Sequence, residues 1–372
     1  MMDTARALAR RMLQAAKRRT LARLGMVSNQ KFYLDSAIVQ PRQDVERIML
    51  HSDAVDIEFV LPVDGSRARN SYRPRFVYGL SDATIDPIPS LVYDSNGQYI
   101  AESSSWLQLR QFWDWPKPRI GVPRARLAGD FIFLPSNNYY HWLIEDLPVF
   151  LKSLAIAPNA RVIVPKDAAG YVHEVAGLID NEKILIDSPT RVERLVMTAK
   201  TGGMGSPVAG LTPHPADVAI LREFFGKYFE RGSCDRKLYL SRVGQVRSPA
   251  NERDLLSRME RQGYSPFEGT SVSLLSQIAM FSSASRLMGL HGAAFANIVW
   301  TREGVDVCEI FSSAYMPSCY SALTAIRGGR YIPVSYTANA KNIVDVETME
   351  RLGEIAGGDF RRHGKIVSMG QN

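Results

Sequence analysis

Cysteine is scarce in this chain: the 372 residues include three cysteines, and no two of them form a CxxC pair. Such a set provides neither a disulfide framework nor a zinc site of the usual spacing. The sequence also lacks a run of about 18 apolar residues, which a membrane-spanning helix needs, and the shorter apolar core of a secretory signal. We therefore expect a protein of a reducing compartment, the cytoplasm.

Two metal-binding patterns are missing as well. There is no HExxH motif, so a zinc metalloprotease is not indicated. There is no Asp-x-Asp motif either, so the sequence does not demand a metal ion that bridges a diphosphate. We expect no tightly bound cofactor and no required metal, with positive side chains neutralising any bound phosphate.

Positive charge is concentrated at one end of the chain. The net charge is +7, yet residues 1–25 hold seven basic side chains against Asp3 and alone contribute +6. A nucleic-acid-binding surface needs basic residues throughout the fold, so we expect no nucleic acid partner. Leu8 and Met12 fall on one helical face of this segment. Two interpretations stay open: a solvated terminus, or a peripheral helix on the inner face of the cytoplasmic membrane.

The length and the hydrophobic pattern predict two domains after this basic segment. The first covers residues 26–215, the second covers 216–345, and residues 346–372 form a C-terminal helix or tail. In the first domain, Asn96-Gly97 between two apolar stretches predicts a hairpin. In the second, strands and helices alternate strictly. That alternation predicts an α/β fold with a parallel, doubly wound sheet covered on both faces.

One junction of the second domain suits a phosphate ligand. In parallel α/β sheets, ligands bind where strands end and helices begin. Gly289-Leu290-His291-Gly292-Ala293 follows an apolar strand and opens a helix, whose unpaired N–H groups suit a diphosphate. His291 adds a hydrogen-bond donor there, and Gly292 has no Cβ to block close approach. A tight turn with a structural histidine is the alternative.

Two further junctions supply charged groups. Arg242 comes directly after a strand, where an arginine can grip a phosphate bidentately, and Arg247 and Asn251 follow it. Glu309 lies near the end of a later strand, where an acid can bind ribose hydroxyls. The helix after Arg242 is expected to begin with Ser248 as its N-cap. An ordinary surface arginine and an ordinary salt-bridged acid are the alternatives.

A candidate general base lies in the first domain. Residues 138–148 follow a strand and open a helix on which His141 and Glu145, four apart, share a face. Asp146 lies at the same helix end. A histidine and acids that face a cleft can act as a general base and its orienter. Asp146 is our first candidate for the base, with His141 and Glu145 as rivals, and a core histidine beside an apolar face is the alternative.

Together these segments resemble glycosyltransferase family 61. The resemblance rests on the order and spacing of motifs over residues 137–311, and residues 1–125 carry none of it. The motifs are Asn138-Tyr139-Tyr140-His141-Trp142-Leu143 with Asp146-Leu147-Pro148, Leu240-Ser241-Arg242 with Arg247 and Asn251-Glu252, Gln277-Ile278-Ala279-Met280-Phe281, Gly289-Leu290-His291-Gly292-Ala293 with Asn297, and Glu309. One departure is Ala294-Phe295, where many relatives have Gly-Leu, and it bears on how the donor fits.

The resemblance implies a GT-B-like architecture, with two Rossmann-like domains that face each other across a cleft. It implies an inverting transfer of a sugar from a nucleotide-sugar donor on the second domain. The acceptor would be a hydroxyl of a glycan or lipid-linked glycan on the first domain, and we expect a role in bacterial surface polysaccharide synthesis. Two other interpretations stay open: a transferase that uses nucleotide-linked sulfate or phosphate, and a non-catalytic sugar-nucleotide-binding or scaffold protein on the same fold.

Overall fold

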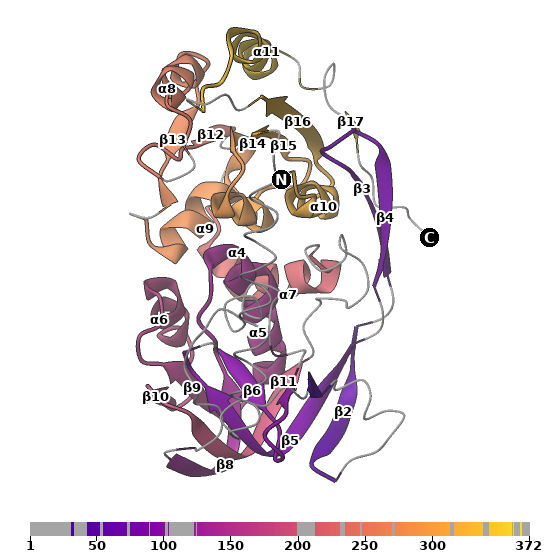
Figure 1. Ribbon diagram of the computed structural model, residues 1–372, viewed down its shortest axis with the longest axis vertical. Coiled ribbons are helices and arrows are strands. Elements are labelled where there is room, and N and C mark those ends of the chain that lie inside the picture. Colours follow the sequence, from indigo (N-terminus) through magenta and orange to yellow (C-terminus); the bar gives the residue numbers. More distant parts are fainter. Residues whose placement is uncertain are drawn as a thin grey trace, which may run out of the picture. The chain divides into compact units, whose positions relative to one another are not determined.

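The computed structural model divides into two compact units, each made of separate stretches of sequence (Figure 1). Unit 1 comprises Met1–Asp53, Pro74–Asn137 and Glu145–Gly202, and unit 2 comprises Ala54–Arg73, Asn138–Ile144 and Gly203–Asn372. The structure describes residues 31–32, 43–52, 55–72, 75–88, 90–100, 103, 123, 125–198, 213–230, 235–245, 248–269, 272–312, 316–337, 342–358, 360 and 365–366. The basic segment 1–25 lies outside these described residues.

The units differ in one respect from the domains expected at 26–215 and 216–345. Those domains were continuous, whereas unit 2 takes two short segments from the first half of the chain. The expected C-terminal helix is present as α11 (Val346–Gly357), which packs within unit 2 against α8 (Glu252–Arg261). Among the described residues, no helix is long and apolar enough to cross a membrane.

Unit 1 contains a nine-stranded mixed sheet in the order β1-β7-β6-β5-β11-β8-β9-β10, with β2 paired to β5. The helices α5 (Leu147–Ile156) and α6 (Gly170–Ala176) connect its parallel strands β8, β9 and β10, and β11 pairs parallel to β8. The strands are β1 (Lys31–Phe32), β2 (Val45–Ser52), β5 (Arg75–Asp86), β6 (Leu91–Tyr93), β7 (Tyr99–Ile100), β8 (Ala125–Phe133), β9 (Arg161–Pro165), β10 (Lys183–Ile186) and β11 (Thr190–Thr198). The hairpin expected at Asn96-Gly97 is confirmed, because β6 and β7 pair antiparallel and Gly97 has a φ of 74°.

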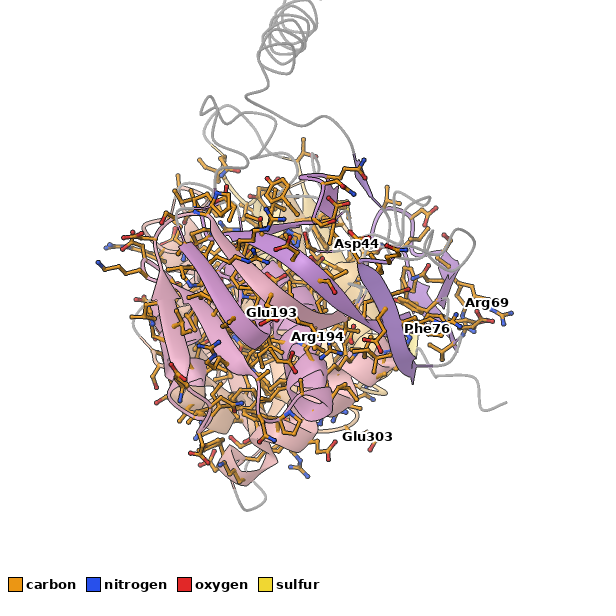
Figure 2. The ribbon with its side chains drawn as sticks, turned by 90° about the horizontal axis from the view of Figure 1, so that it is seen from below. Asp44, Arg69, Phe76, Glu193, Arg194 and Glu303 are labelled. Atoms are coloured by element: carbon orange, nitrogen blue, oxygen red, sulfur yellow. The ribbon has the colours of Figure 1, made fainter. Side chains whose placement is uncertain are left out.

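In β8 and β11 the charged side chains come before the mostly buried residues at the carboxyl ends of the strands. Phe131 and Leu195 contribute to the apolar core of the unit. Arg194 forms ion pairs with Glu46 at 3.1 Å and with Asp130 at 3.3 Å. Figure 2 shows Arg194 beside Glu193 on this sheet. These charged side chains stay partly in water, so the sheet of unit 1 tolerates polar residues along its strands.

Unit 2 contains a six-stranded sheet in the order β13-β12-β14-β15-β16-β17. The first five strands are parallel, as the sequence predicted, and β17 adds an antiparallel edge. The strands are β12 (Arg236–Leu240), β13 (Ser265–Phe267), β14 (Ala284–Leu290), β15 (Asp306–Ser312), β16 (Arg330–Tyr336) and β17 (Lys365–Ile366). The helical elements are α7 (Pro215–Phe225), η4 (Gly226–Tyr228), α8, α9 (Leu274–Ser282), η6 (Ala293–Trp300), α10 (Cys319–Ile326) and α11. Every residue of β15 except the last is buried, so both faces of this sheet are covered.

Two segments from the first half of the chain complete unit 2. The hairpin of β3 (Val55–Val60) and β4 (Arg67–Tyr72) packs on α10, and the Val60 N–H donates to Ser321 Oγ at 3.1 Å (Figure 1). The segment 138–144 packs on η6, where the Tyr139 hydroxyl donates to Asn297 Oδ1 at 2.7 Å. Both contacts join residues that are far apart in sequence.

Two helical expectations need correction and one is confirmed. The helix α8 begins at Glu252 and not at residue 249, and Asn251 occupies the N-cap position expected for Ser248. The helix expected after His291 is present as the 3-10 helix η6. The helix of residues 139–156 changes type along its length, because Trp142–Asp146 is a π-helical turn between α4 (Tyr139–His141) and α5.

Candidate functional site

The order of the strands in unit 2 reverses at one point on the sheet. The chain runs outward from β12 to β13 on one side, and then continues from β14 through β15 to β16 on the other. The order therefore reverses between β12 and β14, which is where open parallel sheets bind ligands, outside the carboxyl ends of the strands. Arg242 lies just beyond the end of β12 and His291 just beyond the end of β14. A guanidinium N–H of Arg242 (Nη1) donates to the His291 carbonyl oxygen.

Two glycines let β12 and β14 meet closely at this point. A Cβ on Gly289 would lie 2.6 Å from the Leu240 carbonyl oxygen, well inside van der Waals contact. A Cβ on Gly292 would lie 3.1 Å from Nη1 of Arg242. The guanidinium therefore lies against backbone that carries no side chain.

The carboxylate of Glu252 fixes the loop that carries Arg242. Its Oε1 accepts the backbone N–H of Arg242 at 2.6 Å, and its Oε2 accepts the Ser248 hydroxyl at 2.5 Å. Glu252 is buried, although it is the first residue of α8. Its charge is therefore held by two donors and by the amino end of a helix.

The His291 ring is enclosed on several sides. Its Nδ1 lies 2.5 Å from Oε1 of Glu309, and its ring stacks on Phe311 with centroids 5.4 Å apart and an interplanar angle of 20°. Tyr320 contacts it at 5.4 Å between ring centroids. The His291 side chain keeps 16% of its surface exposed, so one edge still reaches solvent.

Glu309 was expected to bind ribose hydroxyls, and the structure gives it other partners. Its side chain is 0% exposed, one oxygen meets His291, and the other accepts the Tyr331 hydroxyl at 2.5 Å. Burial, and then the charge of Glu309, raise the pKa of Tyr331 well above its usual range, which keeps this hydroxyl a donor. No pattern in the sequence pointed to Tyr320 or Tyr331, since both are aromatic residues of ordinary apolar elements.

The other residues predicted to bind the donor lie in different surroundings. The side-chain amide of Asn251 exchanges two hydrogen bonds with the backbone of Val344, at 2.8 and 2.9 Å, so it holds the chain before α11. Ala293 opens η6, after Gly292 in an extended conformation. Arg247 lies outside the described residues. Among the described residues, no cluster of three His, Cys, Asp or Glu side chains could hold a metal ion.

The segment 138–144 brings His141 into unit 2. Tyr140 packs edge-to-face on Tyr320 with centroids 5.4 Å apart, and Tyr320 in turn contacts His291. Asn297, which accepts the Tyr139 hydroxyl, donates to Gln277 Oε1 at 3.0 Å. His141, half-buried beside Tyr140, therefore belongs to the same unit as Arg242 and His291.

The acids predicted beside His141 belong to unit 1. Asp146 is fully buried and accepts a hydrogen bond from the Asn137 side-chain amide at 3.2 Å. Burial, and then the Asp146 charge, raise the pKa of Tyr171 to about 12. Glu145 is also buried. His141 is the last residue of α4, and Glu145 lies in the π-helical turn that follows it.

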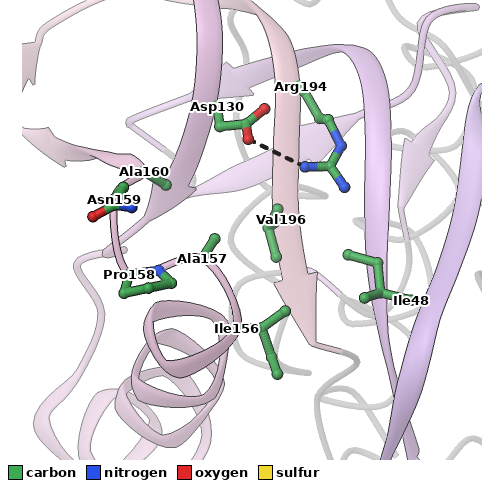
Figure 3. A pocket seen from close by; sticks show the side chains of 9 residues that line it. All are labelled: Ile48, Asp130, Ile156, Ala157, Pro158, Asn159, Ala160, Arg194 and Val196. Carbon is green, nitrogen blue, oxygen red and sulfur yellow. Dashed lines mark hydrogen bonds and ion pairs between the residues drawn. The ribbon is translucent and has the colours of Figure 1, made fainter.

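A cavity of about 330 Å³ opens in unit 1 at the carboxyl end of α5 (Figure 3). Asp130 and Arg194 line it together with apolar side chains such as Ile156 and Val196. None of the predicted site residues lines this cavity. Glu145 and Asp146 precede the opposite end of α5, about 15 Å away along a ten-residue helix.

Known proteins were compared with the chain at the level of structure and of sequence. One similar solved structure is the bacterial iron-containing dodecameric glycosyltransferase TibC from enterotoxigenic E. coli H10407, at 9% identity and a TM-score of 0.26, over 70% of this chain and 74% of that chain. No curated protein sequence matches the chain. The family model described as Glycosyltransferase 61 matches residues 139–308, which include His141, Arg242 and His291. The chain thus carries a domain of glycosyltransferase family 61 and is a glycosyltransferase.

Proposed function

We propose that the chain moves a sugar, with inversion, from a nucleotide-sugar donor to a hydroxyl of a glycan or lipid-linked glycan acceptor. The donor binds unit 2 and the acceptor binds unit 1, in the manner expected of a GT-B-like enzyme. One observation carries the proposal: Arg242 and His291 lie together at the carboxyl ends of β12 and β14, where the strand order reverses.

The chemistry follows from the charges at that point. Inversion is a single displacement in which the acceptor oxygen bonds to the sugar while the nucleoside diphosphate leaves. Negative charge grows on the leaving diphosphate, and positioned donors stabilise it where it develops. The Arg242 guanidinium, the His291 imidazole and backbone N–H groups at Gly292 and Ala293 supply those donors.

A base must take the proton from the acceptor hydroxyl. Of the three candidates, Asp146 and Glu145 are buried, whereas His141 is half-buried. This exposure supports His141 as the base ahead of Asp146, our first choice from the sequence. Loss of a general base lowers kcat by about 10²–10⁴-fold. His141→Asn should therefore cost far more activity than Glu145→Gln, and equal losses would argue against His141.

The donor site can be tested by thermal shift with uridine, guanosine, cytidine and thymidine diphosphates and their sugars. A ligand at about 100 times its dissociation constant stabilises the folded state by about 2.7 kcal/mol. We expect one nucleotide to stabilise the wild type and not Arg242→Ala. Arg191→Ala, which removes an arginine paired with Asp82 in unit 1, is the matched control and should respond like the wild type. If no nucleotide raises the melting temperature of the wild type, the proposed function is wrong.

The setting we propose is surface polysaccharide synthesis at the inner face of a bacterial membrane. It rests on the sequence, in which residues 1–25 carry a net charge of +6. Each basic residue near an anionic leaflet contributes about 1 kcal/mol. The full chain should therefore sediment with vesicles that contain phosphatidylglycerol, and a chain without residues 1–25 should not. Equal sedimentation of the two proteins would rule out this mode of attachment.

A further inference from the structure

Three neighbouring strands of unit 2 converge on one carboxylate. His291 directly follows β14, Glu309 is in β15 and Tyr331 is in β16. The backbone pairs Gly289 with Glu309, and the His291 N–H donates to the Ile310 carbonyl at 2.8 Å. The positions of the three side chains are therefore set by a hydrogen-bonded ladder and not by a loop.

The protons shared by His291, Glu309 and Tyr331 can be assigned from the chemistry of the three side chains. An ionised carboxylate only accepts hydrogen bonds, and the Tyr331 hydroxyl gives its proton to Oε2 of Glu309. Oε1 of Glu309 then needs a donor, and it meets Nδ1 of His291 at 2.5 Å. Nδ1 must therefore carry a proton. Which nitrogen of a histidine is protonated is set by the partner of the other, so this contact also defines the state of Nε2.

We propose that Glu309 is a positioning residue, which together with Tyr331 holds Nδ1–H of His291 so that Nε2 meets the diphosphate of the donor. The inference rests on the proposed function, because His291 must be the residue that meets the donor. Phe311 and Tyr320 restrict the rotation of the ring from its sides.

Nitrogen NMR of the full chain, labelled at histidine, tests the holding contact without any assay of activity. The His291 signals are identified by their loss in His291→Asn. We expect a protonated Nδ1 with a strongly downfield proton in the wild type, and loss of that proton signal in Glu309→Gln. An unprotonated Nδ1 in the wild type, or an unchanged signal in Glu309→Gln, would overturn the proposal.

Binding of the nucleoside diphosphates tests whether Glu309 acts through His291. Loss of a residue that orients a ligand-binding side chain typically lowers the affinity about 10–100-fold. Glu309→Gln should therefore weaken binding of the effective diphosphate about tenfold. In the His291→Asn background, the same change should add less than about twofold. An equal loss in both backgrounds would mean that Glu309 serves only the fold, and would overturn the proposal.

Tyr331→Phe provides a second test of the same contact in case Glu309→Gln does not fold. We expect it to move the Nδ1 proton signal and to weaken diphosphate binding about threefold. Tyr336→Phe is the matched control, because its hydroxyl is on the same strand and donates to Asn342 at 3.0 Å. Equal effects of the two variants would overturn the proposal. If none of the four diphosphates binds the wild type, the proposed donor site is wrong. If a diphosphate binds but Nδ1 of His291 is unprotonated, only the positioning role of Glu309 is wrong.

Discussion

The two sheets of this protein handle charge in opposite ways. In unit 1, charged side chains of β2, β8 and β11 lie at the protein surface and pair with one another there, as Arg194 does with Glu46 and Asp130. In unit 2, β15 is buried along almost its whole length and still carries two acids, Asp306 and Glu309. Each of these two acids has strong donors beside it.

This difference between surface and buried charges indicates which of the two sheets can hold a functional group in a fixed geometry. A surface ion pair is weak and easily replaced, because water competes for both partners. A buried acid is costly unless donors hold it, so its geometry is fixed by the same contacts that make it tolerable. Substitutions of charged residues in the two sheets should therefore differ in their effect on stability.

Arg330→Ala should lower the free energy of unfolding by about 3 kcal/mol. Arg330 binds Asp306 through two hydrogen bonds of 2.6 and 2.7 Å, and the Asp306 side chain is only 6% exposed. Removal of one partner leaves a buried charge with weaker compensation from Arg286 at 3.6 Å. Urea denaturation followed by tryptophan fluorescence measures the loss. A loss below 1 kcal/mol would show that the two sheets treat ion pairs alike.

Asp86→Asn should stabilise the protein at pH 7.5 by about 1–3 kcal/mol. Asp86, in unit 1, is a buried acid with little support: burial raises its pKa from 3.8 to about 6, against a hydrogen bond from the Ile88 N–H. Because the folded pKa lies above the unfolded one, its contribution is full below pH 3.8 and is lost as the pH rises through 6. Urea midpoints at pH 5 and pH 7.5 should differ less in Asp86→Asn than in the wild type. Destabilisation at pH 7.5 would contradict this account.

Gly289→Ala should destabilise unit 2 by about 1–3 kcal/mol and reduce nucleotide binding. Its Cβ would overlap the Leu240 carbonyl oxygen and push β12 away from β14. The matched control is Gly170→Ala at the start of α6 in unit 1, where a Cβ meets nothing within 4 Å. That change should stabilise the protein by about 0.5 kcal/mol, because alanine favours a helix. Thermal unfolding of both variants checks the contrast, and a loss in the control would undo it.

Arg194→Ala should change the free energy of unfolding by less than about 1 kcal/mol. Its side chain is 34% exposed and its two acidic partners are more exposed still. The small effect should shrink further in 1 M salt, where charges are screened over a few ångströms. Denaturation at low and high salt measures it. A loss as large as that of Arg330→Ala would remove the contrast between the sheets.

Local pattern was enough to predict the frame of unit 2. Strict alternation predicted its parallel sheet, and the expected strand ends brought Arg242 and His291 to one edge. Contacts between residues far apart in the sequence could not be predicted from local pattern. Tyr331 is one of several aromatic residues in an apolar strand, and nothing beside it in sequence indicates that its hydroxyl meets Glu309.

The unit boundaries were missed for the same reason. A hairpin such as β3–β4 has the same pattern whether it stays with its neighbours or packs on α10. The π-helical turn at Trp142–Asp146 likewise has no periodic signature, since the apolar residues before and after it keep ordinary helical spacing.

The β3–β4 hairpin also sets an order of events on the ribosome. Val60 and its partner Ser321 are 261 residues apart, so the hairpin is made long before the helix that covers it. At 5–20 residues per second, the hairpin waits on the order of 10–50 s for α10. During that time Ile57 and Phe59, buried in the finished protein, have no partner from α10. Synthesis from the amino end therefore leaves one apolar face of the hairpin uncovered until α10 emerges.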